Sequence, residues 1–171
     1  MELATKLRTI PDFPRAGIQF VDITPLLQDP EAFREAFDQV VTWARTLHFD
    51  LVVAPEARGF LLGAPLALSL GKGFIPVRKP GKLPHRVERG AYQLEYGEAM
   101  LEIHQDAVRP GQRVLVVDDL LATGGTVLAT ADLVARLGGE TVGFGFLVEL
   151  TALAGRAALG EVPVFSVLEV G

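Results

Sequence analysis

The sequence predicts an α/β fold in which helices flank a mostly parallel, twisted β-sheet. Short apolar segments alternate along the chain with segments of helical periodicity. Most of the apolar segments are continuous instead of alternating with polar residues, which is typical of parallel strands covered on both faces. The chain has 171 residues, a length that fits a single domain over residues 1–171.

Three helices are expected. The first begins at Asp29-Pro30-Glu31, which combines an N-cap, a first-turn proline and an early acid. Apolar residues then recur at helical spacing as far as Leu47. The other two helices are expected over residues 60–70 and 126–137, and Gly138 follows the second of them as a stop signal.

Strands are expected between and beyond these helices, over residues 51–54, 74–77, 114–117, 142–148 and 164–167. A β-hairpin is expected before the third of them. Tyr92, Leu94 and Tyr96 alternate with polar residues, Leu101 and Ile103 share one face, and Gly97-Glu98 lies between as the turn.

The composition makes several classes of protein improbable. A net charge of −5 argues against broad electrostatic binding to nucleic acid. No apolar run approaches the roughly 20 residues of a membrane span, and the first ten residues contain no secretory h-region. The chain contains no cysteine, and its three histidines lack metal-ligand spacing, so no protein-held metal site is predicted. A cytoplasmic protein without nucleic-acid or membrane partners is expected.

One loop departs from the acidic balance of the chain. Five cations stand within twelve residues and are opposed only by Glu88: Arg78, Lys79, Lys82, Arg86 and Arg89. A basic loop on an acidic protein suggests local capture of an anion. A solvated surface loop is the alternative, and the charges alone do not decide between the two.

The most informative segment runs from Val114 to Thr126. Its apolar strand leads to Asp118-Asp119, and the turn Ala122-Thr123-Gly124-Gly125-Thr126 then opens a helix. Glycines let the backbone approach a ligand closely, and the amide groups and dipole of the helix N-terminus favour an anion. The segment therefore predicts a phosphate site.

The two adjacent acids need another partner, because carboxylates repel phosphate. Vicinal sugar hydroxyls or a hydrated Mg²⁺ would suit them. A purely structural turn, in which the acids act as caps, is the alternative. A Walker P-loop is excluded because no Gly-Lys-Ser/Thr sequence opens a helix here, and no dinucleotide fingerprint is present.

This segment resembles the phosphoribosyl-pyrophosphate (PRPP) motif of type I phosphoribosyltransferases. The wider chain resembles the adenine phosphoribosyltransferases of that family from about residue 8 to 169. The resemblance is carried, in order and spacing, by residues 10–14, 20–25, 56–60, 76–84 and 94–97. It implies a type I phosphoribosyltransferase-like fold with a small N-terminal hood over about residues 8–28 and a mobile β-hairpin loop over about 79–97.

The resemblance also implies where PRPP binds. Ala122 to Thr126 would hold the 5′-phosphate, and Asp118 and Asp119 the ribose hydroxyls. The pyrophosphate would be bound by Arg58 with the backbone of Ala57 and Gly59, by Lys82, and by Arg78 of the same or a neighbouring subunit. Mg²⁺ would be bound mainly through PRPP, pyrophosphate and water. The family often has a cis peptide at the position of Glu56–Ala57, which is therefore expected here.

For the base, the resemblance implies recognition by a hood. Gln19, Phe20 and Val21 would face adenine, with Leu150 opposite. The common family residue at position 21 is arginine, so only a backbone contact would survive at Val21. Glu95 matches the residue proposed to handle the proton near N7 of the purine, although an exposed hairpin residue is the alternative.

The implied activity is purine salvage: transfer of ribose 5-phosphate from PRPP to adenine, giving AMP and pyrophosphate. A homodimer is usual in the family and is expected here. Two other functions remain open, a PRPP-binding regulator without catalysis and a phosphoribosyltransferase for a 6-oxopurine.

Overall fold

The computed structural model of the protein describes residues 2–93 and 98–171. The chain falls into two compact units, Met1–Gln39 and Val40–Gly171. The predicted hood, residues 8–28, lies within the first unit. That the whole chain acts as one domain stays a prediction.

The first unit is built on an antiparallel pair of short strands. A 3₁₀ helix, η1 (Leu3–Lys6), precedes β1 (Arg8–Pro11) and β2 (Gln19–Asp22), and α1 (Thr24–Gln28) follows. Asp22 joins these elements, because it accepts hydrogen bonds from the Thr24 amide at 2.9 Å and from Nε of Arg8 at 3.0 Å. The hydrogen bonds from Thr24, followed by those from Arg8, lower the pKa of Asp22 to about 2.

Helix α2 (Pro30–Ala44) begins where the sequence predicts. Oδ1 of Asp29 accepts the amide hydrogens of Glu31 at 3.0 Å and Ala32 at 3.1 Å. These amides have no partner inside the helix, so Asp29 is a true N-cap. The apolar spacing continues to Leu47, but the helix ends at Ala44.

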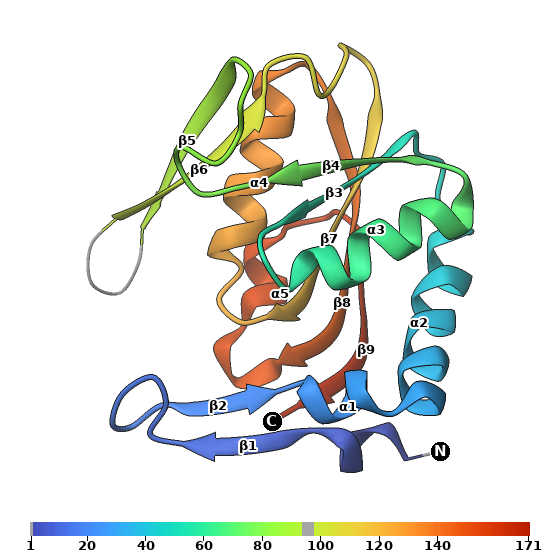
Figure 1. Cartoon of the computed structure of the whole chain (residues 1–171), viewed down its shortest axis with the longest axis vertical. Coiled ribbons are helices and arrows are strands. Elements are labelled where there is room, and N and C mark those ends of the chain that lie inside the picture. Colours follow the sequence, from blue (N-terminus) through green and yellow to red (C-terminus); the bar gives the residue numbers. More distant parts are fainter. Residues whose placement is uncertain (1, 94–97) are drawn as a thin grey trace. The chain divides into compact units, whose positions relative to one another are not determined.

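The second unit contains a five-stranded sheet in the order β4-β3-β7-β8-β9, and every neighbouring pair is parallel (Figure 1). The strands are β3 (Leu51–Pro55), β4 (Gly73–Val77), β7 (Arg113–Leu121), β8 (Glu140–Leu150) and β9 (Val164–Val170). The predicted parallel sheet is therefore confirmed. The last three strands are longer than predicted, because the ladder continues past polar residues such as Asp118, Glu149 and Glu169 that interrupt the apolar pattern.

Helices α3 (Gly59–Leu70) and α4 (Gly125–Arg136) are the crossover connections of this sheet. α3 leads from β3 outward to β4, whereas α4 leads from β7 in the opposite direction to β8. Right-handed crossovers in opposite directions place the two helices on opposite faces, and α3 covers the near face in Figure 1. The strand order thus reverses between β3 and β7, where sheets of this kind bind ligands.

A hairpin is present as predicted, formed by the antiparallel pair β5 (Val87–Gln93) and β6 (Glu98–His104). Leu94, Tyr96 and Gly97, which carried part of the prediction, lie outside the described residues. Glu98 was expected in the turn, but it begins β6 and pairs with Gln93. β5 packs closely on α4, since a Cβ built on Gly90 would lie 3.2 Å from the Leu133 side chain. Two short helices near the C-terminus, η2 (Thr151–Leu153) and α5 (Gly155–Ala158), were not predicted. Within the described residues, no helix is both long and apolar enough for a membrane span.

Candidate active site

The candidate site lies at the carboxyl ends of β3 and β7, on either side of the point where the strand order reverses. β7 continues to Leu121, so Asp118 and Asp119 belong to the strand instead of following it. This corrects the predicted strand end at Val117. Because successive side chains of a strand point to opposite faces, the two acids differ in environment. Asp119 is buried, whereas Asp118 is half-buried and lines a pocket.

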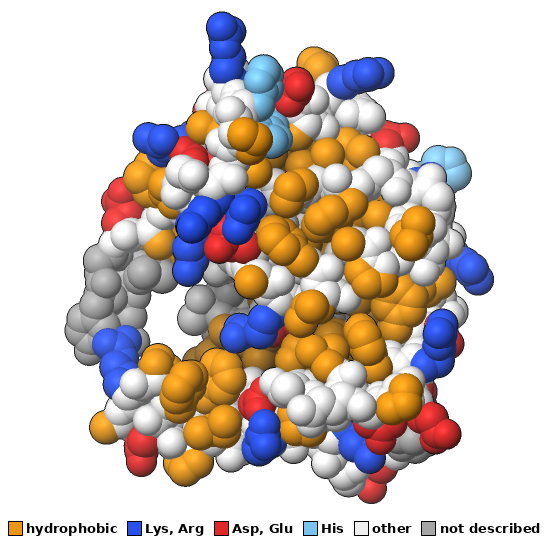
Figure 2. Space-filling model, in the orientation of Figure 1, with side chains coloured by type: hydrophobic (Ala, Val, Ile, Leu, Met, Phe, Trp, Pro, Cys, Tyr) orange, Lys and Arg blue, Asp and Glu red, His pale blue; other side chains and the backbone are white. Residues whose placement is uncertain are grey.

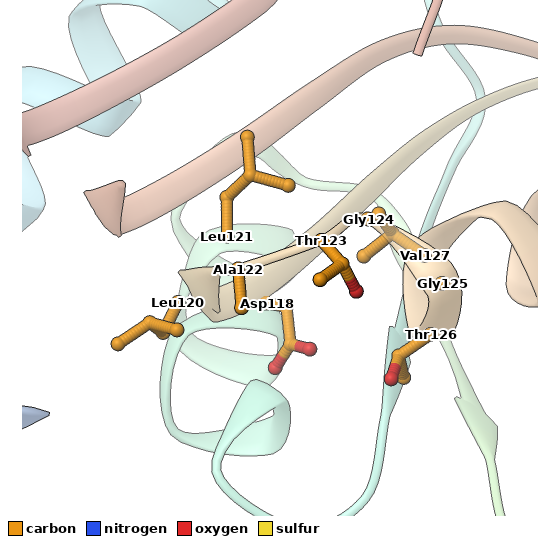
Figure 3. A pocket seen from close by; sticks show the side chains of 9 residues that line it. All are labelled: Asp118, Leu120, Leu121, Ala122, Thr123, Gly124, Gly125, Thr126 and Val127. Carbon is orange, nitrogen blue, oxygen red and sulfur yellow. The ribbon is translucent and has the colours of Figure 1, made fainter. Parts of the chain in front are cut away.

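The pocket is formed by the end of β7 and the turn into α4. Its volume of about 70 Å³ is several times the roughly 10–15 Å³ that one water molecule requires. The oxygen atoms of Asp118, Thr123 and Thr126 face a common space in Figure 3. The predicted phosphate residues Ala122, Thr123, Gly124, Gly125 and Thr126 all line the pocket.

Glycine is required at the centre of this turn. Gly124 has φ = +91°, a left-handed conformation that other residues rarely adopt. Its carbonyl oxygen accepts the amide hydrogen of Leu128 at 2.9 Å. The amides of the first helical turn, which come before Leu128, therefore have no partner inside α4. Free amides and the positive end of the helix dipole favour an anion at this place.

Arg58 lies directly across from β7. Its Nε atom donates to Oδ2 of Asp119 at 2.6 Å. The Asp119 amide in turn donates to Oδ1 of Asp118 at 2.8 Å. Burial of the carboxyl group, followed by the charge of Asp119, raises the pKa of Asp118 well above its ordinary value. The loop after β3 and the acids of β7 therefore form one electrostatic unit.

The peptide bond Glu56–Ala57 is cis, as predicted. The following residues, Arg58 and Gly59, continue into α3. A Cβ on Gly59 would lie only 2.9 Å from Oδ1 of Asp118, so a larger residue would displace the acid. The loop after β3 thus approaches Asp118 closely because residue 59 lacks a side chain.

Comparison with known proteins identifies this combination. A family model described as the phosphoribosyl transferase domain matches residues 30–167. The chain belongs to this family. Adenine phosphoribosyltransferase of Thermotoga petrophila is 60% identical over 93% of this chain and 94% of its own length. The enzyme of that name from Alkaliphilus metalliredigens is 56% identical over 99% of both chains.

Solved structures agree. Adenine phosphoribosyltransferase of Thermoanaerobacter pseudethanolicus superposes with a TM-score of 0.96 at 53% identity, covering 99% of this chain and 98% of its own. The Saccharomyces cerevisiae enzyme, solved with an imino-altritol bisphosphate and adenine, gives 0.89 at 40% identity, covering 98% and 97%.

The remaining site residues predicted from the phosphoribosyltransferase resemblance lie on several different elements. Lys82 is exposed in the basic loop, and Arg78 directly follows β4 and forms an isolated bridge with Glu102. Gln19, Phe20 and Val21 lie in β2 of the first unit, and Leu150 ends β8 in the second. Their meeting at one base site stays a prediction. Glu95 lies outside the described residues.

Two acids that sequence reasoning did not assign are built into this phosphoribosyltransferase. Oε1 of Glu56 accepts from Nε of Arg78 at 3.1 Å and from the Lys79 amide at 2.8 Å. Glu102 is 2% exposed and binds Arg89. The only sequence signal for Glu102 is a charge set between the apolar residues Leu101 and Ile103, all three of which are buried.

Proposed function

We propose that the chain transfers ribose 5-phosphate from PRPP to N9 of adenine, giving AMP and pyrophosphate. The bond from C1′ to the pyrophosphate oxygen breaks, the bond from C1′ to N9 forms, and the base loses one proton. The observation that carries this assignment is the pocket of about 70 Å³ lined by Ala122 to Thr126, placed beside two carboxylates where the strand order reverses. The relatives named above, at 56–60% identity, support adenine as the base.

The described residues divide the substrate among them. The turn from Ala122 to Thr126 binds the 5′-phosphate, and Asp118 and Asp119 accept hydrogen bonds from the ribose hydroxyls. Arg58 meets the pyrophosphate, and Lys82 and Arg78 add charge from the basic loop. Since C1′ becomes oxocarbenium-like as the bond to the leaving group lengthens, stabilising the charge on pyrophosphate is the main catalytic task.

Arg58 has two roles in this scheme. Without substrate it neutralises Asp119 at 2.6 Å. When PRPP binds, the ribose hydroxyls give Asp119 further hydrogen bonds, and the guanidinium group of Arg58 donates to the pyrophosphate. The ion pair thus keeps Arg58 beside the place where the leaving group will lie.

Mg²⁺ fits this site as a partner of PRPP. Within residues 2–93 and 98–171, no group of three or more His, Asp or Glu side chains could hold a metal alone. Asp118 offers one carboxylate to the pocket, which suits a cation that keeps most of its waters and binds through substrate phosphates. The ion supplies charge neutralisation for the pyrophosphate, and Asp118 would contact one of its water molecules.

Incubation with PRPP, Mg²⁺ and single purines tests the proposal. AMP and pyrophosphate are expected with adenine. Turnover with hypoxanthine or guanine alone would instead indicate the 6-oxopurine enzyme. PRPP binding without turnover of any base would indicate the regulator, and no binding of PRPP would reject all three.

Replacing Glu95 with glutamine is expected to lower kcat about a hundredfold while the Kd for PRPP changes little. A carboxylate placed to handle a proton contributes about 10²–10⁴-fold to rate, and the assigned proton is on the base. Steady-state kinetics and PRPP titration measure the two effects separately. Unchanged kcat would remove the assignment, and Glu98→Gln, at the start of β6, is the matched control.

We also propose a homodimer that uses the outer face of α3. Ser69 is the one polar side chain of this helix, and Leu61 and Leu68 are 45% and 83% exposed. Figure 2 shows hydrophobic side chains gathered on the face where α3 lies. An exposed apolar stripe of this kind usually marks an interface.

Leu68→Asp is therefore expected to convert the protein to a monomer at micromolar concentration, because a carboxylate cannot be buried unpaired in an apolar interface. Light scattering after gel filtration measures the mass. Leu128→Asp changes an exposed leucine of α4 and is expected to leave the dimer intact. A wild-type protein that is already monomeric would reject this proposal.

A further inference from the structure

We propose that Glu102 is a positioning residue, which fixes the start of the basic loop so that Lys82 meets the pyrophosphate of PRPP. The proposal rests on the function proposed above. It concerns a buried acid of β6 that the reaction scheme does not use.

The carboxylate of Glu102 is saturated by two segments of the chain. Its Oε2 atom accepts from Nε and Nη2 of Arg89 at 2.7 and 2.6 Å. Its Oε1 atom accepts the amide hydrogen of Gly81 at 2.8 Å. Chiefly this amide, against the effect of burial, lowers the pKa of Glu102, and the group is charged at neutral pH.

The backbone of Glu102 holds the same loop. Its amide donates to the carbonyl of Arg78 at 2.7 Å, and its carbonyl accepts from the amide of Arg78 at 2.9 Å. This bridge joins β6 to the end of β4. Glu102 therefore binds Arg78 through its backbone and Gly81 through its side chain.

Glu56 completes the anchor from the other side. It accepts the amide of Lys79 and the guanidinium of Arg78. Two carboxylates from β6 and the loop after β3 thus bind alternate amides, those of Gly81 and Lys79. Gly81 has φ = +81°, so the chain turns sharply at the residue that Glu102 holds.

Two cations of the basic loop are held in ion pairs by these acids. Arg78 is paired with Glu56, and Arg89 with Glu102. Lys82 is exposed, and no ion pair joins it to another of the described residues. Lys79 and Arg86 are also exposed and form no ion pair with another described residue. Lys82, however, directly follows the anchored Gly81, so its charge is the one that Glu102 positions most directly.

Burying a carboxylate in a strand costs desolvation free energy. Its flanking residues, Leu101 and Ile103, are buried and apolar, and apolar side chains can often replace a buried ion pair without loss of stability. Holding the basic loop in position explains why residue 102 is an acid, whereas packing of the strand alone would not require one.

The test compares two ligands that differ only in the pyrophosphate group. Glu102→Gln removes the charge that binds Arg89 and weakens the hold on Gly81. We expect the Kd for PRPP with Mg²⁺ to rise about tenfold, the lower range for losing a hydrogen bond to a charged group. The Kd for ribose 5-phosphate, which needs only the phosphate turn and the acids of β7, should stay within about twofold of wild type. Equal effects on both ligands, or none on PRPP, would overturn the proposal.

Further variants separate position from stability. Lys82→Ala should produce the same selective loss, and the double variant should be no weaker than Lys82→Ala alone, because both act through one contact. If Glu102→Gln does not fold, Arg89→Gln carries the test, since Arg89 is 54% exposed; the same selective loss is expected, and its absence overturns the proposal. Glu140→Gln, in an exposed ion pair with Arg113, is the matched control and should change neither Kd. Wild-type protein that binds ribose 5-phosphate but not PRPP would reject the proposed function itself.

Discussion

Replacing Gly155 with alanine is expected to lower kcat/KM for PRPP about a hundredfold, the cost of moving a binding group by about 1 Å. Gly155 begins α5 and does not line the pocket. A Cβ at this position would lie 2.2 Å from the carbonyl oxygen of Ala122 and 3.0 Å from the side chain of Leu121. Ala122 opens the phosphate turn, so either the turn or α5 must move.

Movement of α5 is opposed by the next residue. Arg156 forms a two-pronged ion pair with the buried Glu149 of β8, with Nε to Oε1 at 3.0 Å. Nη1 of Arg156 also donates to the carbonyl of Val164 at 2.9 Å, and Ser166 donates to Glu149 at 2.8 Å. Because β8 and β9 hold α5 in place, the phosphate turn is the part expected to yield.

Steady-state kinetics with PRPP, and titration with ribose 5-phosphate, measure the effect. Both ligands should bind more weakly, because both need the phosphate turn. Gly160→Ala is the matched control: this glycine lies two residues beyond α5, and a Cβ there meets nothing within 4 Å. Its positive φ makes alanine slightly unfavourable for folding, yet kcat/KM should stay near wild type. If Gly155→Ala binds ribose 5-phosphate as tightly as wild type, the turn does not depend on α5.

The sequence predicted those parts of the site that are contiguous in the chain. The strand, two acids and turn from Val114 to Thr126 form one local unit, and local glycine and helix-start signals were sufficient to predict it. The N-cap at Asp29 and the parallel order of the sheet followed from equally local patterns. The cis peptide at Glu56–Ala57 was predicted only from the family resemblance.

The contacts that shape this unit from a distance were not predicted. Arg58 and Asp119 are 61 residues apart, and their pairing depends on β3 and β7 being neighbours. In the sequence, Gly155 looks like an ordinary loop glycine, because nothing there shows that it packs against Ala122. Glu102 likewise shows only as a charge in an apolar strand. Periodicity describes one element at a time, whereas these roles depend on which elements touch.

Replacing either acid of β7 is expected to impair PRPP binding, but the two replacements should change stability in opposite directions. Asp118→Asn and Asp119→Asn each remove a charged acceptor for a ribose hydroxyl, so kcat/KM should fall about tenfold to a hundredfold. Asp119→Asn also removes the partner of Arg58. The resulting loss of a charged hydrogen bond at 2.6 Å should destabilise the fold by about 1–3 kcal/mol.

Asp118→Asn should instead raise the midpoint temperature of thermal unfolding at neutral pH. The pKa of Asp118 is higher in the folded state than in the unfolded chain, because burial and the Asp119 charge disfavour its ionised form. The folded protein therefore binds this proton more tightly, and wild-type stability falls as the pH rises through the raised pKa. The advantage of asparagine should be absent below about pH 4, where the acid is protonated even in the unfolded chain, and should grow as the pH rises.

Thermal unfolding of both variants from about pH 4 to neutral pH measures the difference. A destabilised Asp118→Asn at neutral pH would show that the carboxylate is held by favourable contacts. A residue that lowers stability while it binds substrate is typical of a functional site, so a stabilised, inactive Asp118→Asn would support ligand binding at this position over a structural role.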